Sequence, residues 1–96
     1  MTIEHLVWEN RDDIQRIAAR HGAHNVRVFG SVARGGAGPE SDIDLLIDVG
    51  PTTSSWFPAG LLLDLEELLG RRIEVVTERA LNPDIRERVL DKAIRL

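Results

Sequence analysis

The chain has 96 residues and a formal net charge of −4 at pH 7; 43% of its residues are hydrophobic and 29% are charged. This length holds one domain with one core, and the composition is that of a folded chain rather than a disordered one. The absence of cysteine excludes disulfides and thiolate metal sites. The negative charge makes nucleic acid a poor candidate for the main partner, because that binding rests on neutralising phosphates with Lys and Arg.

The cellular location is predicted from what the sequence lacks. No apolar run approaches the roughly 18 residues that a membrane helix needs. The N-terminal residues do not show the basic-then-apolar order of a signal peptide. We therefore expect a single domain over residues 1–96, in the cytoplasm and without a membrane partner.

The first third of the chain predicts a helix followed by a strand. Apolar side chains recur at helical spacing through residues 3–20, and Asn10 could cap a second helix start inside this segment. Residues 26–29 are a short strand candidate. This strand runs directly into Gly30 and Ser31, where we expect a turn and the beginning of a short helix.

The central segment predicts a loop and then a strand. Residues 35–40 contain three glycines and a proline, which is typical of a loop. Residues 43–49 form the second strand, which is mostly apolar and therefore suits a central position in a sheet. One side of this strand carries Ile43, Leu45 and Ile47, and the other carries Asp42, Asp44, Leu46 and Asp48.

The last part of the chain predicts a helix, a strand and another helix. The first of these helices begins near Pro58, has leucines at helical spacing and ends at Gly70. A third strand spans residues 72–77, and Asn82 with Pro83 marks the start of the final helix. The inner face of that final helix is expected to comprise Ile85, Val89 and Ala93, with Ile94 as a further candidate.

These elements predict an α/β (α+β) fold. A sheet of about three strands would carry helices over one or both faces. The polar residues of chemical interest then fall at strand ends and in the adjoining loops, where sites on such folds usually lie.

Asp42 and Asp44 are two residues apart on the second strand, so their side chains project to the same side. Their carboxylates would repel each other unless a positive group lay between them. A hard divalent cation such as Mg²⁺ takes oxygen ligands and supplies that charge. The alternative is an exposed strand end with two solvated acids, so this pair alone is weak evidence for a metal.

Glu74 lies between two apolar residues of the third strand. An uncompensated carboxylate would be costly there if it were buried, so burial requires a partner. If the second and third strands are neighbours, Glu74 converges with Asp42 and Asp44, and three carboxylates around two metal ions is the arrangement of phosphoryl transfer. The alternative is an edge strand on which Glu74 faces water.

Gly30 and Ser31 are candidate phosphate-binding residues. A glycine at a strand end lets a phosphate approach the backbone, and the amides at the following helix start can bind it. Ser31 adds a hydroxyl, and Arg34 adds a cation one turn later. The Gly-Ser dipeptide is common in loops. Its specificity comes from the order: strand, Gly-Ser, short helix, glycine-rich loop, Ser-Asp-x-Asp on the next strand and an acid on a third.

Two segments in this order resemble the signature of the minimal nucleotidyltransferases, small prokaryotic members of the DNA polymerase β superfamily. They are residues 29–35 (FGSVARG) and 41–46 (SDIDLL), and the resemblance continues through residues 72–76 and the final helix. It implies a nucleotidyltransferase that uses ATP and two Mg²⁺ ions.

The resemblance also implies roles for individual residues. Asp42 and Asp44 would ligate both metal ions, and Glu74 would be the third ligand and help to activate the acceptor. Gly30, Ser31, Arg34 and Ser41 would bind the nucleotide. The family most often has Asp at the third acidic position, so Glu74 leaves the reaction rate open.

Stand-alone proteins that this chain resembles are often antitoxins. They pair with a HEPN-domain toxin, usually an RNase, and transfer AMP from ATP to a tyrosine on it. The resemblance therefore implies an antitoxin protein adenylyltransferase. Two alternatives remain: an antitoxin that neutralises its partner by binding alone, against which the intact acids argue, and a transferase for a small molecule, against which the missing second domain argues.

The remaining aromatic and imidazole side chains receive simpler predictions. At least one of Trp8 and Trp56 is expected in the core, whereas an exposed Trp56-Phe57 pair would indicate a protein contact. The histidines have no ligand spacing, and no role is assigned to them.

Overall fold

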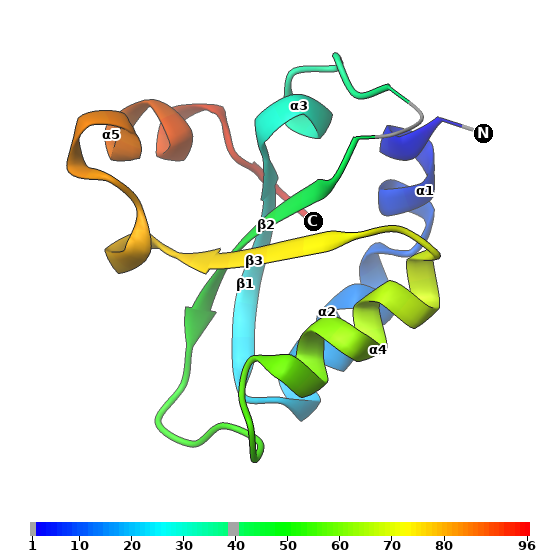
Figure 1. Cartoon of the computed structure of the whole chain (residues 1–96), viewed down its shortest axis with the longest axis vertical. Coiled ribbons are helices and arrows are strands. Elements are labelled where there is room, and N and C mark those ends of the chain that lie inside the picture. Colours follow the sequence, from blue (N-terminus) through cyan, green and yellow to red (C-terminus); the bar gives the residue numbers. More distant parts are fainter. Residues whose placement is uncertain (1, 39–40) are drawn as a thin grey trace.

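A computed structural model describes residues 2–38 and 41–96, and over these residues the chain forms one four-stranded sheet (Figure 1). The strands lie in the order β3-β2-β1-β4. The β2 strand is antiparallel to β1 and parallel to β3, and β4 pairs antiparallel with β1. Their bounds are β1 Ala23–Phe29, β2 Ile43–Val49, β3 Ile73–Thr77 and β4 Ile94–Arg95.

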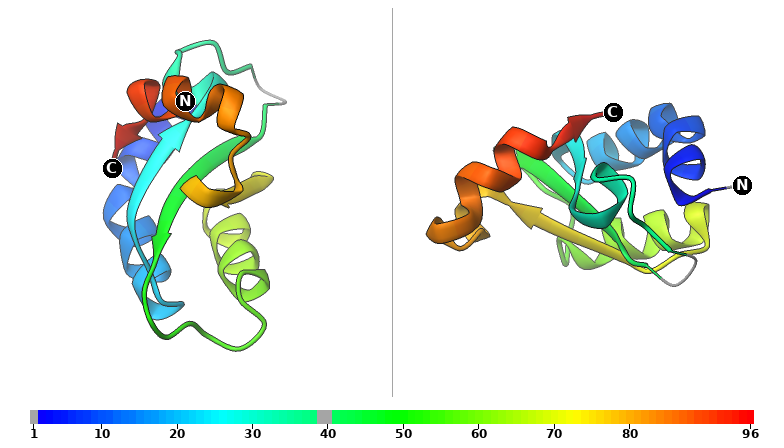
Figure 2. Two further views of the ribbon diagram at one scale, coloured as in Figure 1. Left: turned by 90° about the vertical axis from the view of Figure 1, so that its left-hand side faces the viewer. Right: turned by 90° about the horizontal axis from the view of Figure 1, so that it is seen from above.

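The helices lie on both sides of this sheet (Figure 2). On one side, α2 packs against β1 and α4 against β3, with α1 beside α2. The short α3 follows β1 directly, and the η1 turn with α5 connects β3 to β4 on the other side. The bounds are α1 Ile3–Glu9, α2 Arg11–Arg20, α3 Gly30–Ala33, α4 Ala59–Leu69, η1 Glu78–Ala80 and α5 Pro83–Lys92.

The side chains of β2 alternate between the core and the opposite face. Ile43, Leu45 and Ile47 are at most 2% exposed and belong to the core under α1, α2 and α4. Asp44 and Asp48 are only partly buried, because they point to the side that carries η1 and α5. The predicted alternation is confirmed, and so is the predicted fold class.

Helix boundaries follow local capping signals. The side chain of Asn82 accepts a hydrogen bond from the Asp84 amide at 2.9 Å, and Pro83 occupies the first turn of α5, as predicted. The segment 3–20 breaks at Asn10 into two helices, because Asn10 ends α1 before α2 begins. The glycine-rich loop is predicted over residues 35–40, of which 39 and 40 lie outside the described residues.

Two predictions about the end of the chain are wrong. The sheet has a fourth strand, because the last helix ends at Lys92 and Ile94–Arg95 then pairs with β1. The final helix also lacks a buried inner face: it contains no buried residue, and Ile85 is 40% exposed. Among residues 2–38 and 41–96, no helix combines the length and the apolar character that spanning a membrane would require.

Candidate active site

Asp44 and Glu74 lie side by side on neighbouring strands. The parallel register pairs them across β2 and β3, and their side chains are hydrogen-bonded. The pKa of Asp44 is raised from 3.8 to about 6, first by its partial burial, then by the hydrogen bond to Glu74 and by the charges of Glu74 and Asp42. The guanidinium of Arg34 opposes this rise. The arrangement concentrates negative charge at one point of the sheet.

Gly30 stands directly against this carboxyl group. Its φ is +71°, and a β-carbon at this position would lie 2.3 Å from Oδ2 of Asp44. Phe29, the last residue of β1, is the register partner of Asp44, so the chain turns into α3 right beside the acid. Both the backbone angle and the close contact therefore require glycine here.

The turn is held by backbone hydrogen bonds. The Arg34 amide donates to the Gly30 carbonyl at 3.1 Å, and the Gly36 amide donates to the Ser31 carbonyl at 3.0 Å. The hydroxyl of Ser41 accepts from the Gly38 amide at 2.9 Å. Ser41 is thus tied to Gly38, while Gly30 and Arg34 adjoin Asp44.

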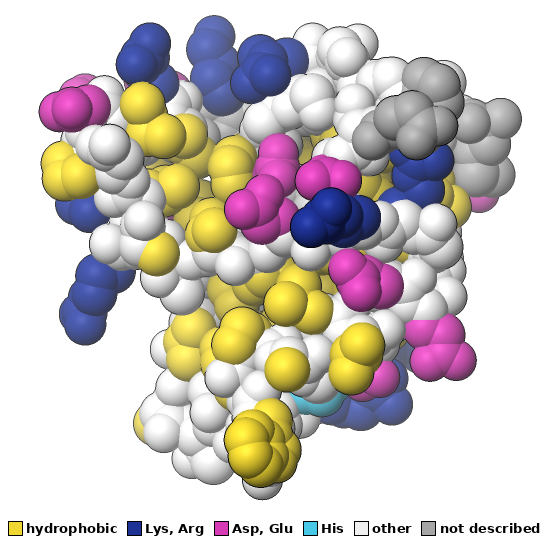
Figure 3. Space-filling model, viewed as in Figure 1, with side chains coloured by type: hydrophobic (Ala, Val, Ile, Leu, Met, Phe, Trp, Pro, Cys, Tyr) yellow, Lys and Arg dark blue, Asp and Glu magenta, His cyan; other side chains and the backbone are white. Residues whose placement is uncertain are grey.

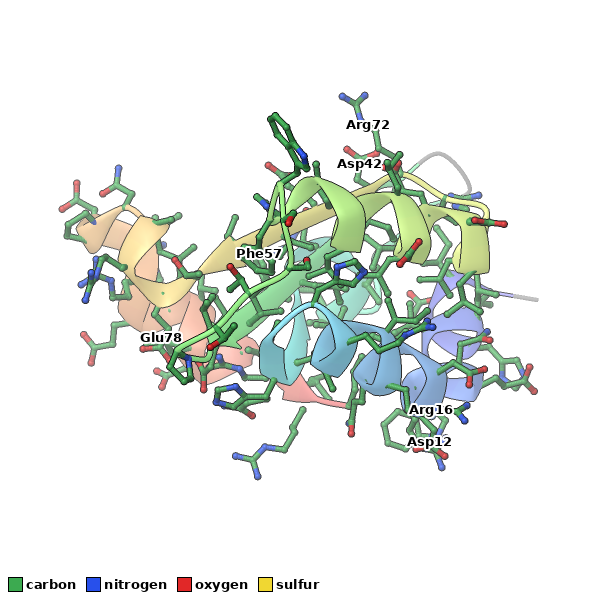
Figure 4. The ribbon with its side chains drawn as sticks, turned by 90° about the horizontal axis from the view of Figure 1, so that it is seen from below. Asp12, Arg16, Asp42, Phe57, Arg72 and Glu78 are labelled. Carbon is green, nitrogen blue, oxygen red and sulfur yellow. The ribbon has the colours of Figure 1, made fainter. Side chains whose placement is uncertain are left out.

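Asp42 is exposed just before β2 begins. The amide of the next residue, Ile43, donates a hydrogen bond to the Arg72 carbonyl at 3.0 Å. The segments that lead into β2 and β3 therefore lie side by side. In Figure 4 the side chains of Asp42 and Arg72 project from the same edge of the molecule. In Figure 3, acidic side chains gather over the middle of the molecule, where β2 and β3 lie in the same view of Figure 1.

The carboxylate groups of Asp42, Asp44 and Glu74 are suitable ligands for a hard cation. Carboxylate oxygens are the ligands that Mg²⁺ prefers. Burial is the main cause of the raised pKa of Asp44, but the charges of Glu74 and Asp42 add to it, and a cation would offset those charges. Within the described residues, no three Asp, Glu or His side chains are grouped so that they could hold one metal ion together. The structure thus brings Asp44 and Glu74 into contact, with Asp42 close enough for its charge to act on Asp44.

The nucleotidyltransferase domain family matches residues 10–96. A candidate protein adenylyltransferase of Methanocaldococcus jannaschii is 34% identical over 89 residues, covering 88% of this chain and 96% of that protein. The protein adenylyltransferase MntA of Thermococcus cleftensis is 32% identical over 92 residues, covering 96% and 90%. The chain belongs to the nucleotidyltransferase domain family.

Solved structures agree with this assignment. That of a candidate minimal nucleotidyltransferase has a TM-score of 0.85 and 48% identity, covering 100% of this chain and 97% of that one. A toxin–antitoxin structure with AMP-PNP has a TM-score of 0.62 and 20% identity, covering 96% and 70%, and this likeness shows the fold alone. The predictions of a minimal nucleotidyltransferase and of an enzyme of this class are confirmed.

In this nucleotidyltransferase, Asp48 is a useful contrast with Asp44, because both point from the same face of β2. Asp48 accepts hydrogen bonds from Asn25 at 2.9 Å and from Arg27 at 2.7 Å. These partners, Asn25 first, hold the pKa of Asp48 below its usual value. Arg27 also binds Glu78 at 3.0 Å. The negative charge of Asp48 is therefore offset by its neighbours in the fold, whereas Asp44 lies among other acids.

The nucleotidyltransferase also has a groove between α3 and α5 that sequence reasoning missed. It has a volume of about 500 Å³ and adjoins the Gly30 turn. Its lining residues are Phe29, Gly30, Arg34, Ile85, Arg88, Val89 and Lys92. A sequence signal existed, since Ile85 and Val89 alternate with Arg88 and Lys92 at helical spacing on α5.

Two predictions, one about the histidines and one about the tryptophans, are wrong. His21 has a structural role: its ring bonds to the Ser54 hydroxyl and to the Asp64 carboxylate, both at 2.7 Å. Neither tryptophan is buried, because Trp8 is 51% exposed and Trp56 is 88% exposed. Phe57, by contrast, packs against the core.

Proposed function

We propose that this chain is an antitoxin that transfers AMP from ATP to a tyrosine hydroxyl of a partner HEPN-domain toxin, with two Mg²⁺ ions bound by Asp42, Asp44 and Glu74. The observation that carries the proposal is the position of Asp44. Its carboxyl group lies among acids and directly against the Gly30 turn. A phosphate bound at the Gly30 turn would therefore lie next to a cation bound by Asp44 and its neighbouring acids. The names of the Thermococcus and Methanocaldococcus relatives support protein adenylylation.

The reaction forms a bond between the acceptor oxygen and the α-phosphorus of ATP and breaks the bond to the oxygen that bridges the α- and β-phosphates. Pyrophosphate leaves with that electron pair. When bound, Mg²⁺ would lower the pKa of the acceptor hydroxyl and offset charge on the leaving group. Glu74 is exposed beside Asp44, so its carboxylate can take the acceptor proton.

The remaining residues of the turn bind the phosphates. Gly30 gives them access to the backbone, and the amides at the start of α3, together with the Ser31 hydroxyl, donate hydrogen bonds. Arg34 contributes positive charge beside Asp44. Ser41 is held to Gly38 by the hydrogen bond that its hydroxyl accepts from the Gly38 amide.

A protein acceptor is supported by the exposure of Glu74 at the edge of the sheet. Glu74 lies on the edge strand β3 and faces solvent, so a large acceptor can approach it. A solved structure with the same fold is a toxin–antitoxin complex with AMP-PNP. We place the reaction in the cytoplasm, where ATP is supplied.

The test is to incubate the chain with Mg²⁺, labelled ATP and the protein encoded by the neighbouring gene. We expect AMP-sized mass increments on a tyrosine of that protein, and none with Asp44→Asn. Asp12→Asn is the matched control, because Asp12 is exposed and lies on the far side from Asp42 in Figure 4. If no label appears and Asp42→Ala still neutralises the toxin, the chain acts by binding alone.

A further inference from the structure

The groove between α3 and α5 is lined by three cationic side chains. Arg34 contributes from the end of α3, and Arg88 and Lys92 contribute from α5. Among the described residues, none of these three side chains has a hydrogen-bond or ion-pair partner. Arg27 of the same chain, in contrast, is satisfied by two acids. Three unpartnered cations around one cavity favour an anionic ligand.

The position of the groove indicates which anion. It begins at Gly30, whose other neighbour is the carboxyl group of Asp44. Gly30 therefore adjoins both an acidic group, Asp44, and a groove lined by basic side chains, so the local charge changes from negative to positive across this turn. A ligand bound along this gradient would place its more negative end at α5 and its metal-bridged part at the acids.

We propose that this groove binds the β- and γ-phosphates of the nucleotide and the pyrophosphate that they become, with Arg88 and Lys92 as the phosphate-binding cations. This inference rests on the proposed function and extends it, because it assigns binding roles to two residues of α5. The leaving group is thereby drawn away from the acids as negative charge develops on it. Arg34 lines the groove and also lies near enough to Asp44 for its charge to act there, so it can contact the phosphates.

The design of α5 agrees with a ligand-binding role. It contains no buried residue, so its side chains contribute little to the core. Ile85 and Val89 line the groove with Phe29, so part of its wall is apolar. Charge-assisted hydrogen bonds to phosphate are stronger in such surroundings than in open water.

The experiment measures the binding of inorganic pyrophosphate and of AMP by isothermal titration calorimetry. The variant is Arg88→Gln with Lys92→Gln, since Gln keeps a good helix propensity and removes the charge. The affinity for pyrophosphate should fall by about tenfold or more, whereas the affinity for AMP should change by less than about threefold. Arg79→Gln is the control of equal type, because Arg79 is exposed on η1 and does not line this groove.

Each outcome decides the proposal. Unchanged pyrophosphate binding in the folded double variant overturns it, and so does a loss of AMP affinity instead, which would place the nucleoside end in the groove. Should circular dichroism reveal that the double variant is unfolded, Lys92→Gln alone, at the last turn of α5, must weaken pyrophosphate binding by about threefold. These measurements need no acceptor, so a failure to label any toxin would count against the proposed function without touching the groove.

Discussion

Gly30 and Asp44 meet so closely that a β-carbon on residue 30 would lie 2.3 Å from Oδ2 of Asp44. The backbone of Gly30 is also in the left-handed region, with φ at +71°. The two constraints are independent, because the close contact involves the side chain of Asp44 on β2, whereas the positive φ is required by the turn into α3. A substitution at residue 30 must therefore displace the acid and strain the turn together.

Gly30→Ala should lower the free energy of unfolding by about 1–3 kcal/mol, from left-handed strain and the displaced carboxyl group. Nucleotide binding should fall as well. Urea denaturation measures the first effect and calorimetry the second. Gly36→Ala is the control: a β-carbon there meets nothing within 4 Å, and its effect should stay within about 0.5 kcal/mol. Equal effects of the two substitutions would refute this account of Gly30.

The raised pKa of Asp44 predicts a pH dependence of stability in chelator. Because the folded-state pKa, about 6, lies above the ordinary 3.8, ionised Asp44 destabilises the folded state. This cost is absent below about pH 4 and complete above about pH 6. Since Asp44 is only partly buried, we expect about 1–2 kcal/mol. Asp44→Asn should thus unfold at a higher temperature than wild type at pH 7.5, and the same order at pH 4 by the same margin would contradict the prediction.

The length of the third acid can be tested at Glu74. Glu74→Gln should reduce the rate of AMP transfer by about a hundredfold, because a charged oxygen ligand is lost. Glu74→Asp keeps the charge and moves it by one methylene, so its rate should stay within about tenfold of wild type. Single-turnover labelling measures both. Glu67→Gln, an exposed acid of α4, is the control. A Glu74→Gln variant as active as wild type would remove this residue from the reaction.

His21 should stabilise the fold without affecting nucleotide binding. Replacing it by Ala removes two side-chain hydrogen bonds of 2.7 Å, to Ser54 and Asp64, and should cost about 2–3 kcal/mol. The loop after β2 lies at the opposite end of the sheet from α3 (Figure 1), so ATP affinity should not change. His5→Ala removes only an exposed pair with Glu9 and should cost less than about 0.5 kcal/mol. A loss of ATP affinity in His21→Ala at full folding would contradict this separation.

Features that depend on neighbouring residues were predictable from the sequence. The alternation of β2 and the capping of α5 by Asn82 are of this kind, because each rests on residues a few positions apart. The order of Gly30, Asp42, Asp44 and Glu74 along the chain predicted that these residues belong to one site. Their contacts required knowledge of which strands are neighbours.

Features that depend on distant pairing were missed. The β4 strand is only two residues long and exists because β1 offers it an open edge. The groove beside Gly30 arises from the way α5 returns across the sheet. The spacing of apolar and basic residues on α5 is visible in the sequence, but it does not show that this face lies beside Gly30. The sequence left two alternatives for Glu74, convergence with the aspartates or exposure on an edge strand. Glu74 is in fact exposed on an edge strand, and it still contacts Asp44.

The exposure of both indole rings has a spectroscopic consequence. Trp8 is 51% exposed and stacks under the Arg11 guanidinium at 4.5 Å, while Trp56 is 88% exposed. Because both rings already face water in the native state, unfolding should shift their emission maximum very little. Intrinsic fluorescence would therefore be a poor reporter of denaturation. It would be a sensitive reporter of any partner that covers Trp56, since dehydration of that ring shifts its emission to the blue.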